Sequence, residues 1–168
     1  MRIYIVRHGE AELAALGSSD AVRQLTAKGQ RQAERVGAAL RVLGEVPAVV
    51  LTSPLPRARQ TAELAVKAMA DKRSRPPIRV LDRLAPGAYV GDVLAAIPAE
   101  PQSVMLVGHQ PTLGALVGAL IGGLHAAPID LSTASLACVE TPGAPQPGAA
   151  ELEYFLRRSV ISALAKSA

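Results

Sequence analysis

The chain has 168 residues, of which 49% are hydrophobic and only 2% aromatic, so we expect one domain with a core of alanine, valine and leucine. Its 18 lysines and arginines against 14 aspartates and glutamates give a net charge of +4. The tyrosines are scattered and form no stacking platform for bases, and the densest basic run, 71–77, reads as a solvated loop before two prolines. These features argue against nucleic acid as a partner.

Neither a membrane span nor a disulfide is expected. The longest apolar stretch, 104–124, is interrupted at His109, Gln110 and Pro111, which leaves about a dozen apolar residues, too few to cross a bilayer. The first apolar run is too short for a secretory signal, and the single Cys138 fits a core position in a reducing compartment. We therefore expect a cytoplasmic protein without membrane contact.

Taken in chain order, short apolar runs alternate with amphipathic segments. The first run, "IYIV" at 3–6, is β-branched or aromatic at three of four positions, as in a strand buried on both faces. After a polar loop at 17–24, Thr26 is a suitable N-cap for a helix that closes at Gly44. The remaining predicted elements are a strand at 46–53, a helix at 54–70, a strand at 78–81, a short helix at 91–98, a strand at 103–109, a helix up to 124, and a hairpin of 133–140 and 150–156 joined by the loop 141–148.

This alternation predicts the fold class: an α/β protein, a single-domain three-layer α/β/α sandwich around a mainly parallel central sheet, spanning 1–168. The helix after the fourth strand carries Gly114, Gly118 and Gly122 at four-residue spacing. We expect this glycine face to pack closely on the sheet.

Basic residues follow three of the predicted strands. Arg7 and His8 end the first strand, Arg57 comes just after the second, and His109 ends the strand at 103–109. Each one alone has an ordinary explanation, as a solvated strand end, a surface arginine or a turn histidine. Because the carboxyl ends of parallel strands share one edge of a sheet, all four residues are expected to converge there, where a phosphoryl dianion is the best-fitting ligand.

The same segments resemble the histidine phosphatase superfamily, whose fold is phosphoglycerate mutase-like. The similarity lies in "RHGEAE", "LTAKGQRQA", "VVLTSPLPRARQTAEL" and "VMLVGHQPTLG", which occur in the family's order. The short chain, "SDAVRQLTAKG" and "STASLACVE" are similar to the SixA type of protein phosphohistidine phosphatase.

The resemblance implies a role for each of the four residues. His8 would be the nucleophile and form a transient phosphohistidine, and it must be neutral to attack, with its other ring nitrogen donating to a backbone carbonyl. Arg7 and Arg57 would bind the phosphoryl oxygens, and a protonated His109 would be a third donor. No metal and no cofactor is implied, and Arg59 is expected to be structural.

One segment departs from the family. Members that act on phosphate esters usually carry a glutamate as general acid, where this chain has Arg83 in Leu81-Asp82-Arg83-Leu84. Asp82, Glu10 and Glu12 are the nearby candidates. A phosphorylated imidazole needs an acid less than an alkoxide does, since it departs as a neutral ring.

The predicted function is therefore removal of phosphate from a histidine-phosphorylated partner protein. A phosphatase for small phosphomonoesters with the same centre and a phosphoprotein-binding module without turnover are the alternatives.

Other phosphatase chemistries lack their residues. A cysteine phosphatase needs an arginine six residues after its thiolate, but Ala144 stands there relative to Cys138. The chain has no Asp-x-Asp pair and no Gly-Lys-Ser/Thr sequence. His125 is expected to be a loop residue and not a metal ligand.

Overall fold

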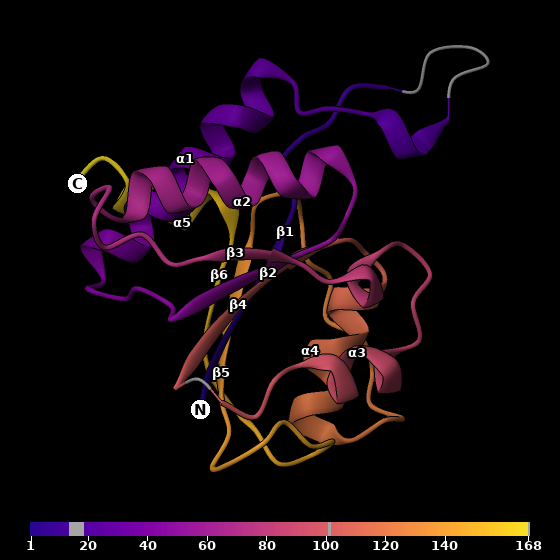
Figure 1. Cartoon of the computed structure of the whole chain (residues 1–168). Coiled ribbons are helices and arrows are strands. Elements are labelled where there is room, and N and C mark those ends of the chain that lie inside the picture. Colours follow the sequence, from indigo (N-terminus) through magenta and orange to yellow (C-terminus); the bar gives the residue numbers. More distant parts are fainter. Residues whose placement is uncertain (14–18, 101, 168) are drawn as a thin grey trace.

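Six strands form one mixed sheet in the computed structural model, which describes residues 1–13, 19–100 and 102–167 (Figure 1). The strand order is β3-β2-β4-β1-β5-β6. The first four are parallel to one another, whereas β5 is antiparallel to β1 and β6 is antiparallel to β5. The bounds are β1 Arg2–Arg7, β2 Val49–Thr52, β3 Ile78–Val80, β4 Ser103–Gly108, β5 Leu136–Glu140 and β6 Glu151–Leu156.

Helices cover both faces of this sheet, which confirms the predicted three-layer α/β/α class. On one face lie α1 (Ala27–Val42), α2 (Pro56–Met69) and α5 (Arg158–Leu164), and on the other lie α3 (Val90–Ala96) and α4 (Thr112–Gly122) (Figure 1). Two 3-10 turns precede α1 and α3, η1 at Asp20–Val22 and η2 at Asp82–Leu84. No helix in the described parts of the chain is long and apolar enough to cross a membrane.

The central strands carry apolar side chains along their middle positions because both of their faces are covered. Ile3 and Ile5 of β1 belong to the core under α3 and α4, whereas Tyr4 and Val6 belong to the core under α1, α2 and α5. All four side chains are at most 3% exposed. An uninterrupted apolar run is what a strand in this position requires.

Glycines bring the start of α1 against the loop that follows β1. A Cβ on Gly9 would lie 2.6 Å from the carbonyl oxygen of Gly29, and a Cβ on Gly29 would collide with the backbone of Glu10. Thr26 caps α1, as predicted, with its hydroxyl accepting from the amide of Gly29 at 3.0 Å. The first turn of α1 is therefore held directly beside the end of β1.

Three expectations need correction. The glycine face of α4 packs on the segment 127–129 and not on the sheet, because a Cβ on Gly114 or Gly118 would collide with the carbonyl oxygens of Ile129 and Ala127. The helix α5 was not predicted, since its seven residues follow β6 directly and are too few to show a helical period. The predicted loop 17–24 contains η1, and its first two residues lie outside the described part.

Candidate functional site

The structure brings the four predicted residues together at the carboxyl edge of the sheet. Arg7, His8, Arg57 and His109 all line one pocket of about 430 Å³. The register explains the meeting, since Arg7 at the end of β1 pairs with Gly108 at the end of β4. The other residues that line the pocket are Glu10, Ala11, Asp20, Arg23, Pro86, Gln110 and Thr133.

His8 is buried and held by its own neighbours. Its amide donates to the carbonyl of Gly108 at 3.0 Å, and its ring Nδ1 lies 2.7 Å from the carbonyl oxygen of Gly9. Because a carbonyl can only accept, Nδ1 carries the proton and Nε2 of the neutral ring carries the lone pair. Burial, with smaller contributions from the charges of Arg57 and Arg7, lowers the pKa of His8 to about 4 despite the upward effect of the hydrogen bond to Gly9. The ring is therefore neutral at pH 7.

Arg57 is 4% exposed and its two terminal nitrogens both bind Asp20. One donates to the backbone carbonyl of Asp20 and the other to its carboxylate, each at 2.8 Å. Arg23 pairs with the same carboxylate at 2.6 Å, and Arg23 and Arg57 together hold the pKa of Asp20 below its usual range. Sequence reasoning singled out neither Asp20 nor Arg23. Their i, i+3 spacing just before the Thr26 cap was the available signal.

Thr61 joins the loop after β1 to helix α2. Its hydroxyl accepts from the amide of Gly9 at 3.1 Å and donates to the carbonyl of Arg57 at 2.7 Å. The side chain is fully buried. This one hydroxyl therefore fixes the backbone of Arg57 relative to the backbone beside His8.

The ring of His109 lies against that of His8, with 4.9 Å between the ring centroids. Nε2 of His109 is 2.8 Å from the hydroxyl of Ser53, which follows β2. Burial, with smaller contributions from His8 and Arg57, lowers the pKa of His109 to about 3. His109 is thus neutral at pH 7, and it would have to gain a proton to act as the third donor that the resemblance implies.

Buried polar atoms without a partner concentrate at this pocket. Within the described residues, four buried side-chain nitrogen or oxygen atoms have no hydrogen-bond partner, and three of them belong to Arg7 (Nε), Arg57 (Nε) and His109 (Nδ1). Such atoms are rare in folded proteins and call for an explanation at each site. Among the described residues, the Arg7 side chain forms one hydrogen bond, from a terminal nitrogen to the carbonyl of Leu131 at 2.7 Å. The pocket therefore has unused capacity for hydrogen bonds to an anion.

None of the candidate general acids is placed to give up a proton. Asp82 and Glu12 are exposed and do not line the pocket, and Arg83 pairs with Asp92 at 3.1 Å outside it. Glu10 does line the pocket, but it pairs with Lys28 at 2.7 Å. The hydrogen bond from Lys28 holds the pKa of Glu10 below its usual range. Among the described lining residues, the carboxylates are thus Glu10 and Asp20, and both are ionised at pH 7.

The remaining candidates lie elsewhere. Arg59 is exposed on α2 and outside the pocket, and His125 is exposed after α4. Cys138 is a core residue, as expected, and burial raises the pKa of its thiol to about 12, so it is no nucleophile at pH 7. The described residues contain no cluster of three or more histidines, cysteines or carboxylates that could hold a metal ion.

Known proteins are similar to this chain in sequence and in fold. Residues 3–89 match the Histidine phosphatase superfamily (branch 1). The chain is 34% identical to an uncharacterized protein of Picosynechococcus sp. over 95% of this chain and 96% of that one. It is 35% identical to the phosphohistidine phosphatase SixA of Escherichia coli (strain K12), over 73% of this chain and 76% of SixA.

A solved structure agrees with the sequence relatives. The protein histidine phosphatase SixA complexed with tungstate superposes with a TM-score of 0.81 and 30% sequence identity, over 95% of this chain and 98% of that one. The chain therefore belongs to the histidine phosphatase superfamily and is a phosphatase resembling the SixA type.

Proposed function

We propose that residues 1–168 form a single histidine phosphatase domain that removes phosphate from phosphohistidine on a partner protein, through a covalent intermediate on His8. The observation that carries the proposal is the contact between His8 Nδ1 and the carbonyl oxygen of Gly9, at 2.7 Å. It leaves the lone pair on Nε2, inside a pocket that Arg7, Arg23 and Arg57 line.

In the first step, Nε2 of His8 attacks phosphorus in line with the P–N bond of the substrate. A bond from Nε2 to phosphorus forms, and the P–N bond breaks with its electron pair going to the departing imidazole. Since the other ring nitrogen of the substrate already carries a proton, the ring leaves neutral. No proton donor is needed on the enzyme.

In the second step, water attacks the phosphorus of phosphorylated His8. The bond to Nε2 breaks, its electron pair returns to Nε2, and the proton of the water passes to solvent as inorganic phosphate leaves. The Nδ1 proton held by Gly9 makes the phosphorylated ring cationic. The His8 ring is therefore as good a leaving group in the second step as the imidazole of the substrate is in the first step.

Arg7, Arg57 and His109 are proposed to bind the phosphoryl oxygens. The planar guanidinium groups match phosphate geometry and donate to oxygens that gain charge in the transition state. A bound dianion also favours the protonated form of His109, because it opposes the burial and the neighbouring cations that hold the pKa of His109 low. Side chains fill each role, so neither a metal ion nor a cofactor is invoked.

Two features support phosphohistidine over phosphate esters as substrate. The carboxylates that line the pocket in the described part of the chain, Glu10 and Asp20, both have a lowered pKa and no proton to give at pH 7, whereas an alkoxide leaving group would need one. Of the described residues between Arg57 and His109, Pro86 alone lines the pocket, so this part of the chain builds no lid over it. A phosphorylated side chain on a protein surface can reach such a pocket. The named activity of the SixA relative is in line with this substrate.

The decisive experiment is phosphate release from a synthetic peptide with one phosphohistidine, in the presence of excess chelator. We expect turnover at an undiminished rate, because side chains fill every proposed role. Binding of the peptide without any release of phosphate would support a binding module instead. Loss of turnover on chelation would overturn the metal-independent mechanism.

A further inference from the structure

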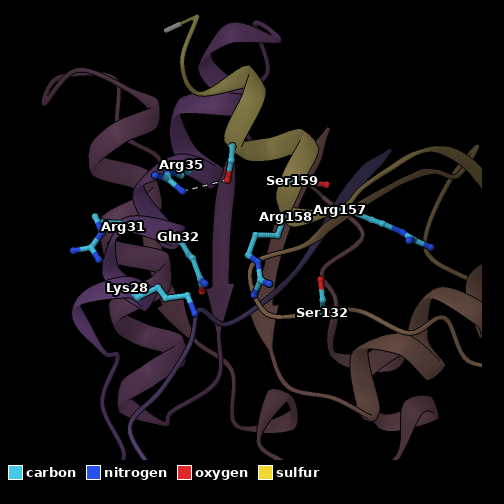
Figure 2. Close-up of a pocket in the computed structure, with 9 residues that line it drawn as sticks. Lys28, Arg31, Gln32, Arg35, Ser132, Arg157, Arg158 and Ser159 are labelled. Atoms are coloured by element: carbon cyan, nitrogen blue, oxygen red, sulfur yellow. Dashed lines mark hydrogen bonds between the residues drawn. The ribbon is translucent and has the colours of Figure 1, made fainter.

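A second hollow, of about 350 Å³, lies between α1 and α5 beside the catalytic pocket (Figure 2). Of the described residues that line it, five are cationic and none is acidic. We call these five residues the basic cleft: Lys28, Arg31, Arg35, Arg157 and Arg158. We propose that the basic cleft binds an acidic segment, rich in aspartate and glutamate, of the histidine-phosphorylated protein. This inference rests on the proposed function and names what the substrate must carry beside its phosphohistidine.

Most of the positive charge in the cleft has no carboxylate to offset it. Only Lys28 forms an ion pair, with Glu10, and no carboxylate of the described residues lies within salt-bridge distance of the four arginines. Arg35 and Arg158 donate to neutral hydroxyl groups, those of Ser162 at 3.3 Å and Thr133 at 3.0 Å. This surface therefore gathers four arginines that have no carboxylate partner among the described residues.

The side chains are spread in a way that suits an extended partner. Figure 2 shows Lys28 and Arg158 reaching into the space between α1 and α5, while Arg31 and Arg157 point outward on opposite sides. Arg35 lies further along α1, where its side chain reaches Ser162 of α5. Positive charge thus continues past both rims of the hollow, which favours several carboxylates on one segment over a single small anion.

The basic cleft is continuous with the catalytic pocket. Glu10 and Thr133 line the catalytic pocket, and each is bonded to a residue of the cleft, Glu10 to Lys28 at 2.7 Å and Thr133 to Arg158 at 3.0 Å. A histidine side chain is short, so a protein that delivers phosphohistidine to His8 must lay its own surface on the rim of the pocket. The adjoining part of that surface then faces the basic cleft.

The chemistry of the cleft favours protein over nucleic acid. No aromatic side chain lines it, whereas surfaces that bind single strands stack bases on aromatic rings. Exposed charges of one sign accelerate association with a partner of opposite sign and contribute less to the chemical step. The cleft should therefore act on substrate capture and leave the reaction at His8 unchanged.

The test compares two synthetic phosphohistidine peptides, one flanked by glutamates and one by glutamines, on wild type and on the double variant Arg31→Glu/Arg158→Glu. For the glutamate peptide, we expect the variant to raise KM on the order of tenfold with kcat within about twofold. For the glutamine peptide and for the small molecule phosphoramidate, kcat/KM should stay within about twofold. The variant Arg73→Glu, in the exposed loop after α2, is the matched control and should behave as wild type.

Salt gives an independent measurement. On wild type, KM for the glutamate peptide should rise between low salt and about 0.5 M salt, and this rise should be lost in the double variant. The proposal would be overturned if wild type had equal kcat/KM for the two peptides. It would also be overturned if Arg73→Glu raised KM for the glutamate peptide as much as the double variant does. Tighter binding of single-stranded RNA than of the glutamate peptide at the same cleft would overturn it as well.

Failure of the proposed function is separable from failure of the docking proposal. If wild type released phosphate from neither peptide nor from phosphoramidate, the proposed reaction would be wrong. The docking proposal is then decided by the affinity of the unphosphorylated glutamate peptide, measured by fluorescence anisotropy. Weaker binding to the double variant than to wild type and Arg73→Glu supports it, and equal binding refutes it.

Discussion

Arg57 is bound at both terminal nitrogens by Asp20, a residue 37 positions earlier in the chain, with two contacts of 2.8 Å. One contact is to the backbone carbonyl and the other to the carboxylate, so the guanidinium is oriented before any substrate arrives. The carboxylate also places a negative charge in the pocket where we propose that the negatively charged phosphoryl group binds. Asp20 therefore both holds the arginine in place and opposes the binding of an anion.

Replacing Arg57 should damage catalysis far more than replacing its neighbour Arg59. Arg57→Ala removes a buried donor to the phosphoryl group, and we expect kcat to fall on the order of 10²-fold or more. Arg59→Ala is the control, because Arg59 is exposed and outside the pocket, and it should stay close to wild type. Steady-state kinetics on the phosphohistidine peptide measures both. Equal losses of kcat in the two variants would show that the phosphoryl-binding role has been assigned to the wrong arginine.

Neutralising Asp20 should tighten the binding of anions. In Asp20→Asn, the carboxylate no longer opposes the phosphoryl charge, so we expect the inhibition constant of inorganic phosphate to fall roughly threefold to tenfold. Asp92→Asn removes an exposed carboxylate paired with Arg83 and is the matched control. An inhibition constant that rose in Asp20→Asn would mean that orienting Arg57 is the dominant role of this residue.

Removing the ring of His8 should abolish turnover without unfolding the protein. We expect His8→Ala to release no phosphate from the peptide above background, while its circular dichroism spectrum matches that of wild type. Wild type quenched during turnover should carry acid-labile, base-stable phosphate, and His8→Ala should carry none. Turnover by His8→Ala at the normal rate would refute the covalent mechanism.

The rates for different substrates should follow how much protonation each leaving group needs. The phosphohistidine peptide should react fastest, aryl phosphates more slowly, and sugar phosphates slowest by several orders of magnitude, since a positioned acid alone is worth about 10²–10⁴-fold for a poor leaving group. The measurement is kcat/KM across the three classes. Sugar phosphates turned over as fast as the peptide would require an acid that the described residues do not provide.

Acidification should destabilise the fold through the two buried histidines. The pKa of His8 is about 4 in the folded protein against an ordinary value near 6.5, so below pH 6.5 the unfolded state binds more protons. Stability present above pH 6.5 is therefore lost as the pH falls towards 4. Between pH 7 and pH 5, wild type should lose about 1–2 kcal/mol more unfolding free energy than His8→Asn.

Urea denaturation in phosphate-free buffer measures this difference. His109→Asn should show a similar reduction in acid sensitivity, because the pKa of His109 is lowered to about 3. His125→Asn is the control, since His125 is exposed. If wild type and His8→Asn lost the same unfolding free energy between pH 7 and pH 5, His8 would not be held neutral by the fold.

Much of the site followed from local pattern. The apolar run before Arg7 and His8 predicted a central strand, and parallel strands must place their carboxyl ends along one edge. The convergence of Arg7, His8, Arg57 and His109 could therefore be predicted from the order of strands and basic residues along the chain, and the fold brings all four into one pocket. The contact from the ring of His8 to a backbone carbonyl could be predicted as well, because a reactive tautomer requires it.

The sequence by itself thus determined the layers of the fold and the edge of the sheet at which Arg7, His8, Arg57 and His109 meet. Hydrophobic periodicity indicates which segments are buried, and the alternation of strands with helices indicates a parallel sheet. Only the tertiary structure decided that Asp20 pairs with Arg57, that His109 rests neutral, and that α5 returns to α1 to form the basic cleft. Those outcomes depend on which of several exposed charges meet across loops, and on how deeply a ring is buried. Neither the pairing of distant charges nor the depth of a ring produces a periodic pattern in the sequence. The charges that meet are far apart along the chain, and the energy differences between alternative pairings are small.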